Sequence, residues 1–256
     1  MTTSERRSLR LAAIGDLHFG RTPASALQPL LTAVANEADI LAICGDLTDT
    51  GHPDEARHLA RELSASVKIP IVAVLGNHDY ESGRVAEVTQ ILTDAGVSVL
   101  DGTACEIHSI GFAGTKGFAG GFGRRALGPW GEPAIKLFVR EALDEALKLE
   151  TALARLGGAS RRIALMHCAP ICETVEGEPP EIYPYLGSSR LEEPLGRYPV
   201  DAVFHGHAHH GTPEGRTKTG VPVYNVSMAL LHRCRPEQQP FRVIELPRTP
   251  SAENGR

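Results

Sequence analysis

The chain has 256 residues, with 26 Lys plus Arg against 31 Asp plus Glu and a formal net charge of −5. Its 42% hydrophobic and 22% charged residues exclude intrinsic disorder, collagen and coiled coil. An acidic balance also lacks the overall basic surface of a dedicated nucleic-acid binder, so nucleic acid is disfavoured as a partner.

Short apolar runs alternate with longer amphipathic stretches along the chain, which predicts an α/β protein whose sheet is buried on both faces. The predicted strands are 9–15, 40–45, 71–76, 107–113, 163–167, 202–205, 221–226 and 241–246. The predicted helices are 24–36, 54–66, 85–95 and 133–156, the last of which ends at two glycines.

No internal repeat and no long linker interrupts this pattern, so we expect one domain over residues 1–256. Two long segments have no regular pattern: a glycine-rich one at 111–131 and a proline- and acid-rich one at 169–187. Loops of this length inside a compact domain are usually functional or disordered.

Nothing in the sequence predicts a membrane or export segment. Each apolar run is far shorter than the roughly 18 residues that span a bilayer, and the run behind Arg10 stops at Asp16. The five cysteines show neither zinc-knuckle nor redox spacing, so reduced thiols are expected. We therefore predict a cytoplasmic protein with no membrane partner.

Polar blocks follow five of the predicted strands. Asp46 comes 30 residues after Asp16 and Asn77 comes 31 after Asp46, which is close to one strand-helix-strand unit. The blocks are Asp16-Leu17-His18, Gly45-Asp46-Leu47-Thr48-Asp49, Gly76-Asn77-His78-Asp79, His167, and His205-Gly206-His207-Ala208-His209. We expect all five strand ends to meet at one crevice rich in His and Asp.

Imidazole and carboxylate donors without thiolate suit Zn, Fe, Mn, Co or Ni. A lone histidine at a strand end is more often an ordinary hydrogen-bonded residue, but the ordered series of blocks is hard to obtain by chance. The seven candidate ligands are too many for one ion: Asp16, His18, Asp46, Asn77, His167, His207 and His209. Two ions about 3.5–4 Å apart form the clamp used for phosphoryl displacement.

The series of blocks resembles the signature of the calcineurin-like metallophosphoesterase superfamily. The resemblance spans residues 16–209 and implies two mixed β-sheets packed as a sandwich and flanked by helices. It also implies one metal held by Asp16, His18, Asp46 and His209, and a second held by Asp46, Asn77, His167 and His207. Asp46 would then bridge two divalent or mixed-valence ions.

The resemblance further implies a mechanism in which a hydroxide that bridges the metals attacks phosphorus. His78 would stabilise the pentavalent phosphate or protonate the leaving alkoxide, and Asp79 would orient His78. Asp49 would support the ligands through an outer hydrogen bond.

Departures from other branches narrow the expected substrate. Asp49 is followed by Thr50 rather than the Arg-Gly of protein phosphatases, and Asp49 stands where purple acid phosphatases carry a tyrosine. The blocks look most like small bacterial phosphodiesterases, so the expected substrate is a small phosphodiester, including a nucleotide. A broad phosphomonoesterase stays open, as does a non-catalytic interaction module on this fold, which would predict eroded ligands. The native metal, the physiological substrate and the oligomeric state are not predicted.

Two loops are candidates for substrate contacts. Lys116, Arg124 and Arg125 in the glycine-rich segment are predicted to bind a phosphate, against the alternative of a flexible surface loop. The acidic residues at 173–181 would repel polyphosphates, which favours a monoanionic diester.

Overall fold

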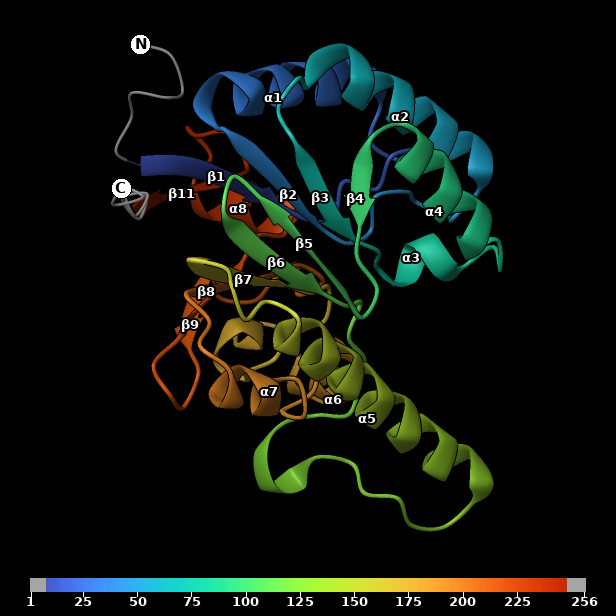
Figure 1. Cartoon of the computed structure of the whole chain (residues 1–256). Coiled ribbons are helices and arrows are strands. Elements are labelled where there is room, and N and C mark those ends of the chain that lie inside the picture. The colour runs from blue at the N-terminus through green and yellow to red at the C-terminus, as the bar shows by residue number, and fades with distance from the viewer. Residues whose placement is uncertain (1–7, 248–256) are drawn as a thin grey trace, which may run out of the picture.

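The first sheet has five strands and lies in the upper half of Figure 1. In the computed structural model, which describes residues 8–247, its order is β11-β1-β2-β3-β4. β1 to β4 run parallel, and β11 pairs antiparallel with β1. The strands are β1 (Ser8–Ile14), β2 (Ile40–Cys44), β3 (Ile71–Val74), β4 (Val97–Val99) and β11 (Arg242–Pro247).

The second sheet has six strands in the order β5-β6-β7-β8-β10-β9. Its four central strands are parallel, and β5 and β9 pair antiparallel at its two edges. The strands are β5 (Thr103–Ile107), β6 (Ile110–Gly114), β7 (Arg161–Leu165), β8 (Ala202–His205), β9 (Glu214–Arg216) and β10 (Pro222–Asn225). Both sheets are therefore mixed.

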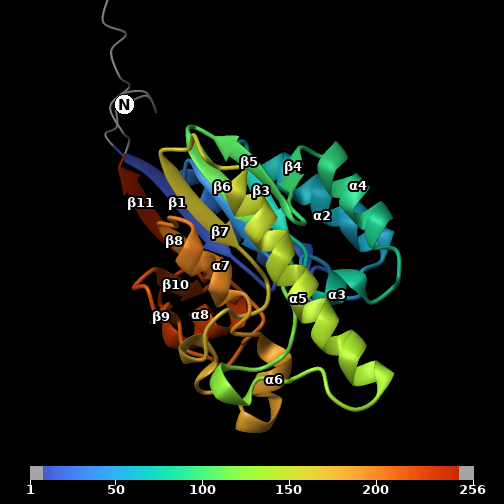
Figure 2. The ribbon, with the colours of Figure 1, turned by 60° about the horizontal axis from the view of Figure 1, so that its bottom comes forward.

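The two sheets pack face to face, and helices cover their outer faces (Figures 1 and 2). α1 (Ala24–Glu37), α2 (Pro53–Ser66) and α4 (Val85–Asp94) lie on the first sheet, and α5 (Pro133–Ala154) and α7 (Glu192–Arg197) lie on the second. The architecture confirms the expected sandwich of two mixed sheets between helices.

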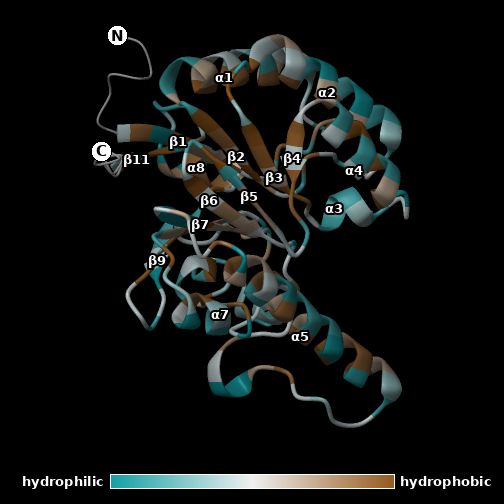
Figure 3. Cartoon of the chain, viewed as in Figure 1, coloured by the Kyte–Doolittle hydropathy of each residue, from teal (hydrophilic) through white to brown (hydrophobic). Residues whose placement is uncertain are grey.

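Strand periodicity explains the layers, because successive side chains point to opposite faces. Along β2, Leu41 and Ile43 pack under the helices, whereas Ile40, Ala42 and Cys44 face the second sheet. Every residue of β2 is buried, so its sequence is continuously apolar. Figure 3 shows β2, β3 and β4 as hydrophobic and much of the solvent-facing side of the covering helices as hydrophilic.

Most predicted elements are confirmed, but the strand predicted at 107–113 is wrong. That stretch covers the end of β5, a two-residue turn and most of β6. The turn residues His108 and Ser109 both have positive φ, 53° and 64°, as a tight hairpin requires. Several elements were not predicted: β4, β5, β9, α3 (Asn77–Tyr80), α6 (Tyr183–Leu186), α7 and α8 (Met228–Cys234).

The glycine-rich segment predicted at 111–131 begins within β6, and its irregular part, residues 115–132, runs from β6 to α5 and keeps this name below. In Figure 1 it forms a loop that extends away from the two sheets together with the first turns of α5. Among the helices of residues 8–247, none combines the length and the apolar character needed to cross a membrane.

Candidate metal centre

The predicted ligand blocks meet at the carboxyl ends of strands from both sheets. Asp16 and His18 follow β1, Asp46 follows β2 and Asn77 follows β3. His167 follows β7, and His207 and His209 follow β8, so the second sheet supplies three imidazoles. Contacts between the sheets include His167 Nε2 at 3.4 Å from Asp46 Oδ2 and His209 Nε2 at 3.2 Å from Asp16 Oδ1. The five strand ends therefore converge as the sequence predicts.

The backbone at these strand ends adopts a conformation that is unfavourable for side-chain-bearing residues. Asp16, His18, Asp46 and His207 have φ values of 59°, 43°, 48° and 70°. Apart from the hairpin turn, these are the positive-φ residues other than glycine within residues 8–247. Strain of this kind persists where the surrounding structure enforces it, and it is concentrated at functional sites.

Two glycines allow the strand ends to approach one another closely. A Cβ on Gly45 would lie 2.2 Å from Nδ1 of His167, and φ at Gly45 is +84°. A Cβ on Gly76 would lie 2.2 Å from Oδ1 of Asp46. The glycines in the Gly-Asp and Gly-Asn blocks are therefore required so that candidate ligands from neighbouring strands can pack against the backbone.

The candidate ligands form two clusters, and a third group of His18, Asp46 and His78 shares one residue with each of them. One cluster is Asp16, His18 and His209, and the other is Asp46, His167 and His207; within each, the donor atoms lie within 4.8 Å of one another. Asp46 Oδ2 is 3.4 Å from His167 Nε2 and 3.7 Å from His18 Nε2. The carboxylate of Asp46 thus contacts one imidazole of each cluster.

The hydrogen-bond partners of the second cluster leave lone pairs pointing at a common space. His167 Nδ1 lies 3.0 Å from the carbonyl oxygen of Cys44, which can only accept, so the proton belongs on Nδ1. In the neutral ring this tautomer leaves Nε2 as an acceptor, 2.9 Å from Asn77 Oδ1 and 3.4 Å from Asp46 Oδ2. Acceptors that converge without a donor are complementary to a cation.

The first cluster contains buried nitrogen atoms that lack hydrogen bonds. Both ring nitrogens of His18 are buried and have no hydrogen-bond partner, although Nδ1 lies 3.2 Å from Asp49 Oδ1. Buried polar atoms are normally paired, so such atoms need a partner. The described residues therefore fit metal binding at both clusters.

Burial favours the neutral form of two of these imidazoles, which is the form that metal ligation requires. It lowers the pKa of His207 to about 3 and lowers the pKa of His18 below its usual value. The hydrogen bond to Asp16 instead raises the pKa of His209. Burial raises the pKa of the Asp46 carboxyl. Burial also acts to raise the pKa of Asp16, but the hydrogen bond to His209 and the charges of neighbouring histidines outweigh it and lower that pKa.

His78 lies beside the clusters on α3. Its ring is half-buried and its centroid is 4.6 Å from that of His18, in an edge-to-face arrangement. Its backbone N–H donates to Asp46 Oδ1 at 2.9 Å, and its Nδ1 lies 2.6 Å from the carbonyl oxygen of Asp49. This contact orients the ring and directs Nε2 away from the Asp49 carbonyl.

Asp79 occupies a different position from the one expected. Its fully buried carboxylate accepts hydrogen bonds from the N–H groups of Gly76, Leu47 and Thr48 and from the Thr48 hydroxyl. The atom that contacts the His78 ring is the Asp49 carbonyl oxygen. Asp79 ties the turn after β2 to the turn after β3, so it acts on His78 through the backbone.

Two further charged residues near the site were not predicted. Arg21 Nη2 lies 3.1 Å from Asp49 Oδ1, and Arg21 follows His18 by only three residues. Glu145 of α5 is buried and accepts from Thr115 Oγ1 and the Gly117 N–H, while the intervening Lys116 carbonyl accepts from the His167 N–H. A carboxylate on the apolar face of a predicted helix was the available signal for Glu145.

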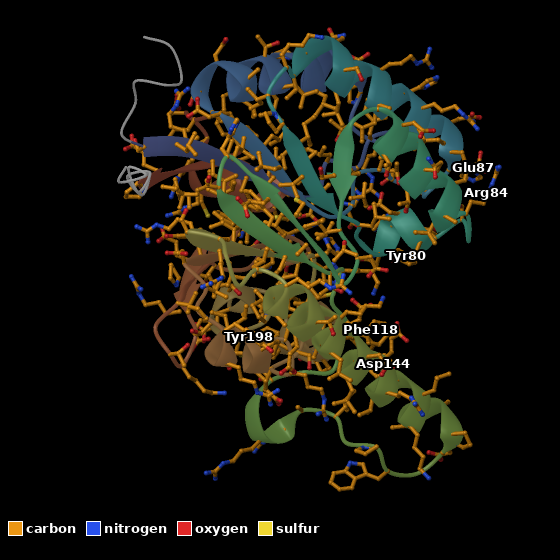
Figure 4. All side chains as sticks on the ribbon, viewed as in Figure 1. Tyr80, Arg84, Glu87, Phe118, Asp144 and Tyr198 are labelled. Carbon is orange, nitrogen blue, oxygen red and sulfur yellow. The ribbon has the colours of Figure 1, made fainter. Side chains whose placement is uncertain are left out.

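The three predicted phosphate-binding residues differ in their surroundings. Lys116 is partly buried, with Nζ 5.4 Å from the ring centroid of Tyr80 and 4.9 Å from that of Phe118, two residues labelled in Figure 4. Arg124 and Arg125 are exposed on a short 3-10 turn, and in residues 8–247 no ion pair or hydrogen bond joins their side chains to the clusters.

Fold and site together define a metal-binding α/β sandwich with its donors at the strand ends. The sequence matches the calcineurin-like phosphoesterase family over residues 9–211, which is most of the chain. The protein therefore belongs to this family, whose members are metal-dependent hydrolases of phosphoesters. No curated protein matches the sequence.

Several solved structures share the fold. Phosphopantetheinyl hydrolase from Mycobacterium tuberculosis has a TM-score of 0.65 and 16% identity, covering 97% of this chain and 99% of that one. A putative 5'-nucleotidase from Staphylococcus aureus has a TM-score of 0.54 and 14% identity, covering 85% and 48%. GAP50, the anchor in the inner membrane complex of Plasmodium, has a TM-score of 0.51 and 14% identity, covering 88% and 73%.

Proposed function

We propose that this protein is a two-metal phosphoesterase that hydrolyses a small phosphodiester. The observation that carries the proposal is the pair of donor clusters joined by Asp46, with His78 beside them. One ion would be held by Asp16, His18, Asp46 and His209, and the other by Asp46, Asn77, His167 and His207. When bound, such a pair of cations lowers the pKa of water and neutralises charge on the phosphoryl oxygens.

The protein's own residues would position and protonate the substrate. His78 is the proposed proton donor to the leaving alkoxide or the group that stabilises the phosphoryl charge, because its ring lies beside the clusters and is accessible. Asp49 holds the His78 ring through its carbonyl and approaches His18 through its carboxylate. Asp79 fixes the two turns that carry these groups.

Lys116 is the proposed phosphate contact of the glycine-rich segment, because its ammonium lies near the ring of Tyr80, the last residue of α3, and donates to the Gly117 carbonyl. Arg124 and Arg125 are proposed to add only long-range attraction, since their charges are exposed and screened by solvent.

A diester is favoured over more highly charged substrates by acidic groups near the site. The N–H of His210, next to the candidate ligand His209, donates to the buried Glu178 carboxylate. The same segment reaches the second cluster, where His207 Nε2 lies 3.2 Å from the carbonyl oxygen of Tyr185. Negative charge beside the site disfavours dianionic monoesters and polyphosphates.

The names of the structural relatives support hydrolysis of a phosphorylated organic group, since one is a phosphopantetheinyl hydrolase and another a putative 5'-nucleotidase. A phosphomonoesterase is the second candidate, and the nucleotidase favours it. The anchor GAP50 favours a non-catalytic module instead. All seven candidate ligands are present in this chain, which supports an enzyme.

The test is hydrolysis of bis(p-nitrophenyl) phosphate and p-nitrophenyl phosphate by chelator-stripped protein reloaded with Mn²⁺. We expect metal-dependent turnover with a higher kcat/KM for the diester. A higher kcat/KM for the monoester would assign a phosphomonoesterase. No turnover of either ester, with two ions bound, would support the non-catalytic module.

Mn, Fe, Zn, Co and Ni all suit these ligands, so the proposal does not depend on one metal. The cytoplasmic location stays a prediction of the sequence.

A further inference from the structure

A cavity of about 470 Å³ opens directly from the first cluster. Asp16, His18 and His209 line one part of it, and its walls come from α1 and α8. Pockets that bind small organic molecules fall in the range of roughly 300–1,000 Å³, so the space is larger than a phosphate needs. The cavity is continuous with the proposed site of phosphoryl transfer and can hold another part of the same substrate.

The walls of the cavity are aliphatic. α1 contributes Ala26, Leu27 and Leu30, and α8 contributes Met228 and Ala229. Leu27 and Leu30 are 0% and 4% exposed, so they form a buried base that the core under α1 fixes. The aliphatic surface that a ligand can reach comes from Ala26, Met228 and Ala229. Among the lining residues in the described part of the chain there is no Phe, Tyr or Trp on which a nucleobase would stack.

Mostly polar residues line the remaining surface, with Pro240 among them. His232 and Gln239 are exposed, and Arg21, which is ion-paired with Asp49, lies near the clusters. The cavity thus offers ligand donors at one place, aliphatic walls, and exposed polar groups elsewhere. A substrate molecule that carries a phosphate, an aliphatic chain and a polar end would match these three kinds of surface.

We propose that the cavity between α1 and α8 binds an aliphatic ester group of the substrate, so that the protein selects alkyl phosphodiesters over nucleotides. The inference rests on the proposed function, because the phosphate must lie at the clusters. Removing alkyl surface from water provides the selectivity: each buried methylene contributes about 0.8 kcal/mol, or about fourfold in kcat/KM.

The test uses p-nitrophenyl phosphodiesters whose second ester group is methyl, ethyl, n-propyl or n-butyl, with the p-nitrophenyl ester of thymidine 5'-phosphate as the nucleotide. The assay uses Mn²⁺-loaded protein, and every substrate releases the same nitrophenolate. We expect kcat/KM to rise about 50-fold from methyl to n-butyl. Equal rates across the alkyl series, or a preference for the thymidine ester, would overturn the inference.

Two variants narrow the cavity without touching the core. Ala26 and Ala229 line it but are solvent-exposed, so A26F and A229F place a ring in the cavity. We expect each to reduce the butyl-to-methyl ratio to below about fivefold. Ser25 is exposed on the same helix and does not line the cavity, so S25F is the matched control and keeps the wild-type ratio. A ratio unchanged in both A26F and A229F would contradict the inference.

A binding measurement separates this inference from the proposed function. Calorimetric titration with n-butyl methylphosphonate and methyl methylphosphonate requires no turnover. We expect tighter binding and a more negative heat-capacity change for the butyl compound, which marks burial of apolar surface, and we expect A26F to abolish the difference. Absent hydrolysis with this difference present would refute the proposed function alone. Identical binding of the two phosphonates would refute the cavity as an alkyl site.

Discussion

The turns after the strands and the glycine-rich segment both carry candidate functional residues, but the fold constrains them very differently. Asp16 and Asp46 are buried and held at positive φ. In the glycine-rich segment Glu145 holds the first residues, and the N–H groups of Gly120 and Gly121 donate to the carbonyls of Pro184 and Gly187. Further along the segment, by contrast, the side chain of Trp130 is 75% exposed. Groups that must be positioned within a fraction of an ångström belong where several strands determine the backbone together.

The largest expected effect follows from removing the carboxylate that both clusters share. Asp46→Ala should lower kcat by more than about 10³-fold, because neither proposed ion keeps its full ligand set. The measurement is metal-dependent hydrolysis of bis(p-nitrophenyl) phosphate. Asp54→Ala is the control, since Asp54 is highly exposed on α2. Activity of Asp46→Ala within tenfold of wild type would contradict the two-metal proposal.

His78→Ala tests whether His78 donates a proton to the leaving group or stabilises the phosphoryl charge. General acid catalysis typically contributes about 10²–10⁴-fold, so kcat should fall by about that factor while Mn²⁺ affinity is retained. The loss should be greater for a diester with an alkoxide leaving group than for nitrophenolate, which needs no proton. Equal losses would assign His78 to the phosphoryl charge, and a loss below threefold would contradict both roles.

Gly45→Ala tests whether the turn after β2 tolerates a side chain at this position. The added Cβ would lie 2.2 Å from His167 Nδ1 at a residue with φ of +84°. We expect the free energy of unfolding to fall by about 2 kcal/mol or more in urea denaturation. Gly157 has open space around its Cβ position, so Gly157→Ala should change the free energy of unfolding by less than about 0.5 kcal/mol. Equal effects would mean that the turn is not constrained.

The smallest effects are expected in the glycine-rich segment. Lys116→Met should raise KM by about tenfold, because its partly buried ammonium is held near the site. The double variant Arg124→Ser, Arg125→Ser should raise KM by less than about fivefold, since exposed charges contribute at most about 1 kcal/mol. A larger rise in KM for the arginine variant than for Lys116→Met would contradict the assignment of Lys116 as the main phosphate contact.

The sequence predicted the strand ends well because their signals are local. Each ligand block follows an apolar run such as Ile40–Cys44, and the spacing of about 30 residues reflects one strand-helix-strand unit. The convergence of β7 and β8 on the same edge followed from the histidines that end them. The family blocks then added the two-sheet arrangement, which periodicity alone does not contain.

The elements and contacts that escaped prediction depend on partners distant in the chain. β9 has the sequence Glu-Gly-Arg, and it is a strand only because it pairs with β10. The contact of His78 with the Asp49 carbonyl and the support of the Lys116 loop by Glu145 join separate elements. The cavity between α1 and α8 likewise has no sequence signal, because its walls are ordinary core and surface positions of two helices.

The most direct test of the central claim is the number and coupling of ions at the strand ends. Chelator-stripped protein would be titrated with Mn²⁺ by calorimetry, and the loaded protein measured by electron paramagnetic resonance. The proposal predicts two ions per chain with the spectrum of a spin-coupled pair, and loss of that coupling in Asp46→Ala. One ion per chain, or two ions without coupling, would contradict a centre bridged by Asp46.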